Sequence, residues 1–237
     1  MRKPNRTAAG RSNPGEVSLA SAAATSVPPT LLDQALFLVE FFGARMERNA
    51  GAGRRRGKLD RLALGVAGVE ELDHIDPSSC DGIGLMRSEF LFRDGAPLPD
   101  EETQYRAYRR FVEWAVGKPV TIRTLDIGGD KPVRGLTPDG EANPFLGLRG
   151  VRLTLAREDV FRTQLRALAR AAVHGNLKVM VPMVTVPEEI TRCAALFDAC
   201  VAELDAQGIA AQRPPLGIMV EVPAVAVTPE LFAAAAF

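Results

Sequence analysis

The segment VTIRTLDIGGDKP, residues 120–132, decides the fold of this 237-residue chain. It begins with apolar and β-branched residues, which are typical of a buried strand, and it ends in a charged turn that contains two glycines. Arg123 lies inside the part that otherwise favours a core position. Burying a charge without a partner is costly in free energy, so the position of Arg123 indicates that this side chain has a function at the end of the strand.

Short apolar stretches of this kind recur along the chain and alternate with longer amphipathic stretches. We expect strands at residues 62–66, 82–86, 120–125, 145–148, 177–182 and 216–221. We expect helices at about 69–74, 100–116, 158–173 and 187–207, with a further helix starting near 224–230. This alternation predicts the α/β class, in which helices cover a parallel sheet. The strands are mostly continuous apolar runs, which indicates cover on both faces.

The chain divides into three regions. Residues 1–28 are rich in Pro, Gly, Ser and Ala and have no hydrophobic period, so we expect a disordered tail. Residues 29–58 predict an amphipathic helix followed by a basic linker, and Arg54–Arg56 in that linker are interpreted as solvated charges. Residues 59–237 form the α/β region.

Composition excludes several classes of protein. The chain is 46% hydrophobic and 24% charged with a formal net charge of zero, so neither nucleic acid nor an acidic surface is an expected partner. Its three cysteines lack the spacing of a metal knuckle or a redox pair, which favours a cytoplasmic setting. No apolar run is long enough to span a bilayer, so we expect no membrane partner.

Four charged residues share one position relative to the expected strands. Arg87, Arg123 and Arg149 lie at or just after the ends of three strands, and Glu221 closes a fourth. The carboxyl ends of parallel strands meet at one rim, where α/β proteins build their active sites. We therefore expect these four side chains to converge.

The residue types indicate the chemistry of such a rim. Three guanidinium groups in one pocket repel one another, and their planar forks match the oxygens of phosphate or carboxylate. A small phosphorylated carboxylic acid would satisfy them. Glu221 supplies a hard oxygen ligand suited to Mg²⁺ or Mn²⁺. The structural alternative is that each arginine forms an ion pair with a nearby carboxylate, for which SEF (88–90) and DEE (100–102) are candidates.

Several segments also resemble a known family. DGIGLMRSEFLFRD (81–94), VTIRTLDIGGDKP (120–132), NPFLGLRGVRLTL (143–155) and LGIMVEVPAVA (216–226) are similar, in the same order, to motifs of one domain. That domain is the phosphoenolpyruvate (PEP)-binding C-terminal domain of the PEP-protein phosphotransferases, Enzyme I of the sugar phosphotransferase system. The resemblance covers residues 59 to about 230.

The resemblance implies a (β/α)8 TIM-type barrel that binds PEP and Mg²⁺ at its carboxyl rim. Arg87, Arg123 and Arg149 are similar to the family's PEP-binding arginines, and Glu221 is similar to a magnesium ligand. The family transfers the phosphoryl group of PEP to a histidine on a separate domain, from which it reaches the acceptor protein HPr. The family's barrel also dimerises, which implies a possible homodimer.

The chain departs from the family pattern at both ends. We find no counterpart of the module with the phospho-accepting histidine, of a GTNDL-like segment, or of the family's catalytic cysteine, so no catalytic residue is assigned. Only about six of eight strands are expected, which predicts an incomplete barrel and a truncated or inactive copy. Two alternatives stay open: a fragment of a pyruvate phosphate dikinase or PEP synthase, and a non-catalytic module that senses PEP or binds a partner.

Overall fold

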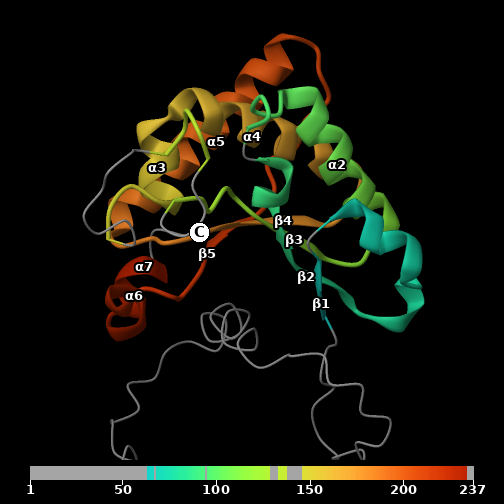
Figure 1. Ribbon diagram of the computed structural model, residues 1–237, viewed down its shortest axis with the longest axis horizontal. Coiled ribbons are helices and arrows are strands. Elements are labelled where there is room, and N and C mark those ends of the chain that lie inside the picture. The colour runs from blue at the N-terminus through green and yellow to red at the C-terminus, as the bar shows by residue number, and fades with distance from the viewer. Residues whose placement is uncertain (1–62, 67, 94, 129–132, 138–145, 234–237) are drawn as a thin grey trace, which may run out of the picture.

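A parallel sheet forms the centre of the molecule (Figure 1). The computed structural model describes residues 63–66, 68–93, 95–128, 133–137 and 146–233. Within these ranges the sheet has five strands in sequential order: β1 (Ala63–Val66), β2 (Gly82–Arg87), β3 (Val120–Arg123), β4 (Leu177–Val181) and β5 (Leu216–Ile218). The predicted α/β class is confirmed. The described strands form an open sheet, in which β1 pairs only with β2 and β5 only with β4.

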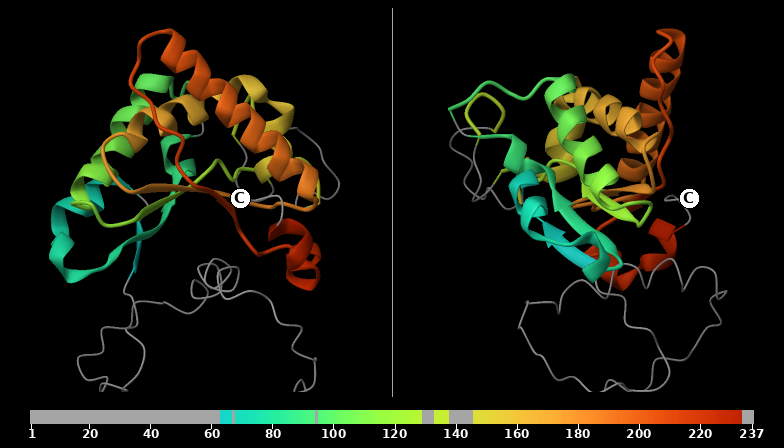
Figure 2. Two further views of the ribbon diagram at one scale, coloured as in Figure 1. Left: turned by 180° about the vertical axis from the view of Figure 1, so that it is seen from behind. Right: turned by 90° about the vertical axis from the view of Figure 1, so that its right-hand side faces the viewer.

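The helices follow the strands in the order that a parallel sheet requires. The α-helices are α2 (Glu101–Trp114), α3 (Gly150–Ala156), α4 (Glu158–Ala172), α5 (Pro187–Ala206), α6 (Pro223–Val227) and α7 (Pro229–Ala233). The 3-10 helices are η2 (Val69–His74), η3 (Pro77–Ser79) and η4 (Ser88–Leu91). Figures 1 and 2 show α2, α4 and α5 over one face of the sheet, with α6 and α7 beyond β5. None of these helices is both long and apolar enough to cross a membrane.

The core lies between that face of the sheet and the helices. Val120 and Ile122 of β3 are fully buried and pack in the same cluster as Tyr108 of α2, Phe161 of α4 and Phe197 of α5. Since side chains alternate along a strand, Arg123 points away from this cluster. Val120 and Ile122 thus fix β3 in the core, while Arg123, its last residue, lies at the carboxyl end of the sheet.

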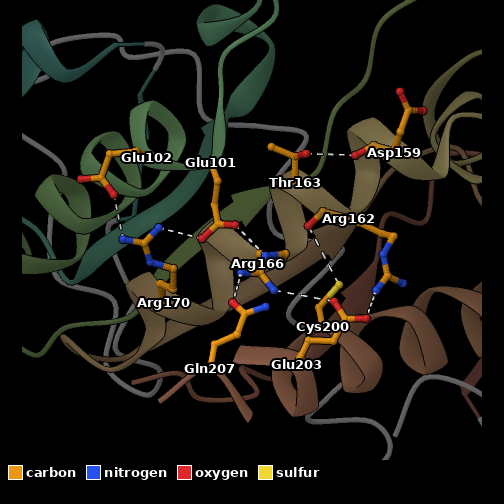
Figure 3. Close-up of polar contacts among 10 residues, drawn as sticks. All are labelled: Glu101, Glu102, Asp159, Arg162, Thr163, Arg166, Arg170, Cys200, Glu203 and Gln207. Atoms are coloured by element: carbon orange, nitrogen blue, oxygen red, sulfur yellow. Dashed lines mark hydrogen bonds and ion pairs between the residues drawn. The ribbon is translucent and has the colours of Figure 1, made fainter. Parts of the chain in front are cut away.

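A network of ion pairs joins the outer helices (Figure 3). Glu101 of α2 lies 2.6 Å from Arg166 and 2.7 Å from Arg170, both on α4. Arg166 donates in turn to Gln207, which follows α5, at 2.8 Å. The network therefore links α2, α4 and the end of α5, and it involves none of the four predicted site residues.

Two sequence predictions of local structure were wrong, and one helix was not predicted. Residues 146–148 form a turn and bends instead of the strand expected at 145–148. The strand expected at 216–221 ends at Ile218. Helix α3 was not predicted. The predicted tail at 1–28 and the helix and linker at 29–58 lie outside the described residues.

Candidate functional site

Two of the four predicted site residues end strands of the sheet. Arg87 is the last residue of β2 and Arg123 is the last residue of β3, and the two are partners in the parallel register. The other two lie in the connections. Arg149 is the N-cap residue of α3, and Glu221 lies between β5 and α6. The four residues therefore come from the carboxyl side of the sheet, although only two stand at strand ends.

Arg123 is held by carboxylates on two different connections. Its side chain is only 8% exposed and forms an ion pair with Glu89 of η4. Its Nη1 also lies 3.1 Å from Oδ2 of Asp126 and donates to Sδ of Met219 at 3.8 Å. Its Nε has no hydrogen-bond partner among the residues that the structure describes. The guanidinium is thus fixed in orientation by Glu89, Asp126 and Met219.

Asp126 connects the second arginine to the first. Arg149 Nη2 lies 3.2 Å from Asp126 Oδ1, while the other carboxylate oxygen forms an ion pair with Arg123. Asp126 is 4% exposed, and the side chain of Arg149 is 12% exposed. Two largely buried arginines therefore meet at a single carboxylate.

The charges of Asp126, Arg123 and Arg149 act on the carboxylate of Glu221. Its Oε1 accepts a hydrogen bond from the backbone N–H of Met183 at 2.7 Å. Burial raises the pKa of Glu221, and the negative charge of Asp126 also raises it, whereas the Met183 N–H, Arg123 and Arg149 act in the opposite direction. The carboxylate is therefore partly desolvated beside two cations and one anion.

Two glycines, Gly128 and Gly150, let the loops on the carboxyl side of the sheet pack closely against one another. Gly128 has a φ of 111°, and a Cβ placed on it would lie 2.8 Å from Cβ of Arg149. Gly150 has a φ of 52°, and a Cβ there would lie 2.8 Å from Cβ of Met183. Only glycine meets both the backbone and the space requirement at such positions. The glycines thus let the segment after β3, the start of α3 and the segment after β4 nest together.

Arg87 differs from the other two arginines. It is exposed, and its guanidinium lies 5.7 Å from the centroid of the Phe90 ring. The structure therefore brings Arg123, Arg149 and Glu221 together. Arg87 lies on the strand next to that of Arg123, and its guanidinium faces the Phe90 ring. Because the Arg87 guanidinium is exposed, it can turn toward an incoming anion at little cost in free energy.

Sequence reasoning missed the part played by Asp126. The signal for it is an acid three residues after a buried arginine, in the turn that leaves the strand. The SEF segment supplies Glu89, which forms an ion pair with Arg123, as the structural alternative expects. Glu89 and Asp126 both hold arginine side chains in place. The arginines therefore form ion pairs and also lie together on the carboxyl side of the sheet.

The group has the donors of an anion site but few metal ligands. No cluster of three or more His, Cys, Asp or Glu side chains that could hold a metal ion occurs among the described residues. Mg²⁺ is commonly bound by one or two carboxylates, with water and substrate oxygens completing the shell. Glu221 fits that role as a single hard ligand, whereas both oxygens of Asp126 already face arginines.

A parallel sheet with helices between its strands and arginines at its carboxyl side places this chain in the class of α/β proteins, whose ligand sites lie where the strands end. The chain belongs to the family described as PEP-utilising enzyme, PEP-binding domain, whose model matches residues 47–236. The four candidate residues all lie within the matched range.

Curated relatives agree with this assignment. A phosphoenolpyruvate-protein phosphotransferase of Enterococcus faecalis is 41% identical over 189 residues, which are 78% of this chain and 33% of that protein. The protein of the same name from Haloferax volcanii is 46% identical over 176 residues, or 73% of this chain and 31% of the relative. That from Priestia megaterium is 43% identical over 173 residues. The chain thus spans about a third of the length of these relatives.

Proposed function

We propose that this chain is the PEP-binding region of a phosphoenolpyruvate-protein phosphotransferase and that PEP binds at the carboxyl rim of the sheet. One observation supports this above the others: Arg123 and Arg149, two largely buried cations, meet at Asp126 beside Glu221. The family match and the names of the relatives supply the identity of the anion.

Each arginine has a distinct part in binding. Arg123 and Arg149 are oriented in advance by Asp126, so little conformational entropy is lost when the anion arrives. Arg87 leaves the Phe90 ring and closes on the ligand from the exposed side. PEP carries phosphate and carboxylate groups, both of which suit the guanidinium fork. As the phosphoryl group leaves, the fixed cations stabilise charge that spreads over its oxygens and over the enolate.

Glu221 is the proposed ligand of Mg²⁺ from this chain. When bound, the cation would neutralise charge on the phosphate oxygens. Glu221 is already partly desolvated, so a cation would also relieve the cost of its ionised form. Met183 holds the carboxylate in place through its backbone N–H.

The finer features of the family are part of the same proposal. The parallel sheet corresponds to strands of a (β/α)8 barrel. The physiological acceptor is HPr, reached through a histidine domain, and the protein works in the cytoplasm as a homodimer formed through the barrel. The names of the reported relatives favour this assignment over a pyruvate phosphate dikinase or PEP synthase.

Isothermal titration with PEP in the presence of Mg²⁺ tests the proposal. Arg87→Gln should weaken binding by about ten- to a hundredfold, the value of one or two charge-assisted hydrogen bonds. Arg106→Gln is the matched control, because Arg106 is also exposed but pairs with Glu102 on the outer surface of α2. Equal effects of the two substitutions, or no binding by the unaltered chain, would refute a PEP site at this rim.

Pyruvate release separates the enzyme from a sensor. With PEP, Mg²⁺ and HPr present, turnover identifies a phosphotransferase. Because the phosphoryl group reaches HPr through a histidine domain, the assay also includes that domain as a separate protein. Binding without turnover in its presence identifies a module that senses PEP.

A further inference from the structure

A chain of buried side-chain hydrogen bonds runs from α4 to the rim. Gln164 of α4 is 1% exposed, and its Nε2 donates to Oγ of Ser88 at 3.0 Å and to the hydroxyl of Tyr108 at 3.0 Å. Its Oε1 accepts from the backbone N–H of Leu125 at 2.9 Å. Every hydrogen-bonding group of this amide therefore has a partner.

The partners of Gln164 lie within the segments that bear the site. Ser88 stands between Arg87 and Glu89 on the segment that follows β2. Leu125 stands immediately before Asp126 on the segment that follows β3. One amide on α4 thus ties together two connections whose acids, Glu89 and Asp126, both hold Arg123.

The hydrogen bonds of Gln164 are costly to lose. Ser88 is fully buried and Leu125 is 2% exposed, so water does not readily replace a missing partner. A buried donor left without an acceptor pays its full desolvation cost. The Leu125 N–H would have to move to find another acceptor, and Asp126 would move with it.

We propose that Gln164 is a positioning residue for the anion site, which sets the spacing between the segments after β2 and β3 and hence the orientation of Arg123 and Arg149. The proposal rests on the proposed function for the identity of the ligand. It extends the site to a helix residue whose side-chain hydrogen bonds go to Ser88, Tyr108 and Leu125, and it explains why a glutamine occupies the core face of α4.

Gln104 provides a matched control. It is also fully buried, and its Oε1 accepts from the same Tyr108 hydroxyl at 3.0 Å. Its amide donates to the carbonyl of Pro99 at 2.9 Å, in the segment that precedes α2. Gln164→Leu and Gln104→Leu therefore remove similar buried amides from one network, but only the first breaks bonds to the rim segments.

The experiment measures PEP affinity by titration calorimetry and unfolding by urea for the full chain and both variants. We expect similar losses of stability, with PEP affinity reduced at least about tenfold in Gln164→Leu and less than about twofold in Gln104→Leu. Parallel losses of affinity in the two variants, or no loss in Gln164→Leu, would overturn the positioning role. If Gln164→Leu does not fold, Ser88→Ala removes one rim contact and should weaken PEP binding by about threefold to tenfold without unfolding the chain. Unchanged affinity in Ser88→Ala would then overturn the role.

A second measurement needs no ligand. The side-chain Nε–H signals of Arg123 and Arg149 in ¹⁵N-resolved NMR spectra report how each guanidinium is held. They should shift or broaden in Gln164→Leu and stay in place in Gln104→Leu. If the unaltered chain does not bind PEP, the proposed function fails, and these signals alone decide the positioning role: unchanged signals in Gln164→Leu contradict it.

Discussion

Gly128 shows how a single residue shapes the rim. Its φ of 111° and its approach to Arg149 together exclude a side chain. Gly128→Ala should lower the free energy of unfolding by about 1–3 kcal/mol through backbone strain, and it should also weaken PEP binding because Arg149 is displaced. Unfolding by urea and titration calorimetry measure the two effects.

Gly135→Ala is the control for that substitution. Gly135 has a φ of 81°, and a Cβ there would meet no atom of the described residues within 4 Å. It therefore shares the backbone strain without touching the site. If Gly135→Ala reduces PEP affinity as much as Gly128→Ala does, contact with Arg149 is not the cause.

Glu221 predicts a pH dependence with a definite sign. Burial raises the pKa of Glu221 above its ordinary value of 4.5, so its ionised form destabilises the folded chain. This cost is absent below pH 4.5, where the side chain is protonated in both states, and it is complete above the raised pKa. Glu221→Gln keeps an oxygen acceptor for the Met183 N–H and cannot ionise.

We therefore expect Glu221→Gln to be more stable than the unaltered chain at pH 8 without Mg²⁺, with the difference shrinking toward pH 4.5. Urea unfolding at several pH values measures this difference. Mg²⁺ should strengthen PEP binding in the unaltered chain and not in the variant. A variant that is less stable at pH 8 would show that Glu221 is stabilised as an anion and would remove the reason for a cation there.

At the scale of the elements, Glu101 is the junction of the ion pairs that hold α2 to α4 (Figure 3). Glu101→Ala should reduce the free energy of unfolding by about 1–3 kcal/mol, since it leaves two partly buried guanidinium groups without this partner. Arg106→Ala, which breaks an exposed pair within one helix, should cost about 0.3–0.5 kcal/mol. Urea unfolding distinguishes the two. Equal costs would mean that the network does not join the helices.

The elements that were predicted correctly have strong periodic patterns. The amphipathic helices expected near 100–116, 158–173 and 187–207 correspond to α2, α4 and α5, and the short helix expected near 69–74 is the 3-10 helix η2. The error at 145–148 arose because FLGL has the composition of a strand, yet Leu146 is 76% exposed. Helix α3 escaped notice because it is buried at most positions, which removes the amphipathic period.

The candidate site was predictable only in part. Arg87 and Arg123 could be predicted from the local sequence pattern, because each follows an apolar stretch that forms a strand. The meeting of Arg149 with Asp126 depends on the fit of Gly128 against Arg149, a contact between segments that no local period encodes. The link from Gln164 to Leu125 is of the same kind, because it joins a helix to a connection 39 positions away.

At the scale of the whole molecule, sheet and site depend on each other. The helices bury one face of the sheet (Figures 1 and 2). The connections on its carboxyl side bring the charges together. In this group two arginines face three acids, so the arginines are already neutralised without a ligand: Arg123, Arg149, Glu89, Asp126 and Glu221. An incoming phosphate must therefore compete with Asp126 and Glu89 for the arginines, and Arg87 with a cation at Glu221 would tip that balance.

A crystal structure of the chain with PEP and Mn²⁺, whose anomalous signal marks the cation, tests the central claim most directly. We expect the phosphate in contact with Arg123 and Arg149, the Arg87 guanidinium turned from Phe90 to the ligand, and the cation beside Glu221. PEP bound elsewhere, or a rim that stays unchanged at millimolar PEP, would contradict the account.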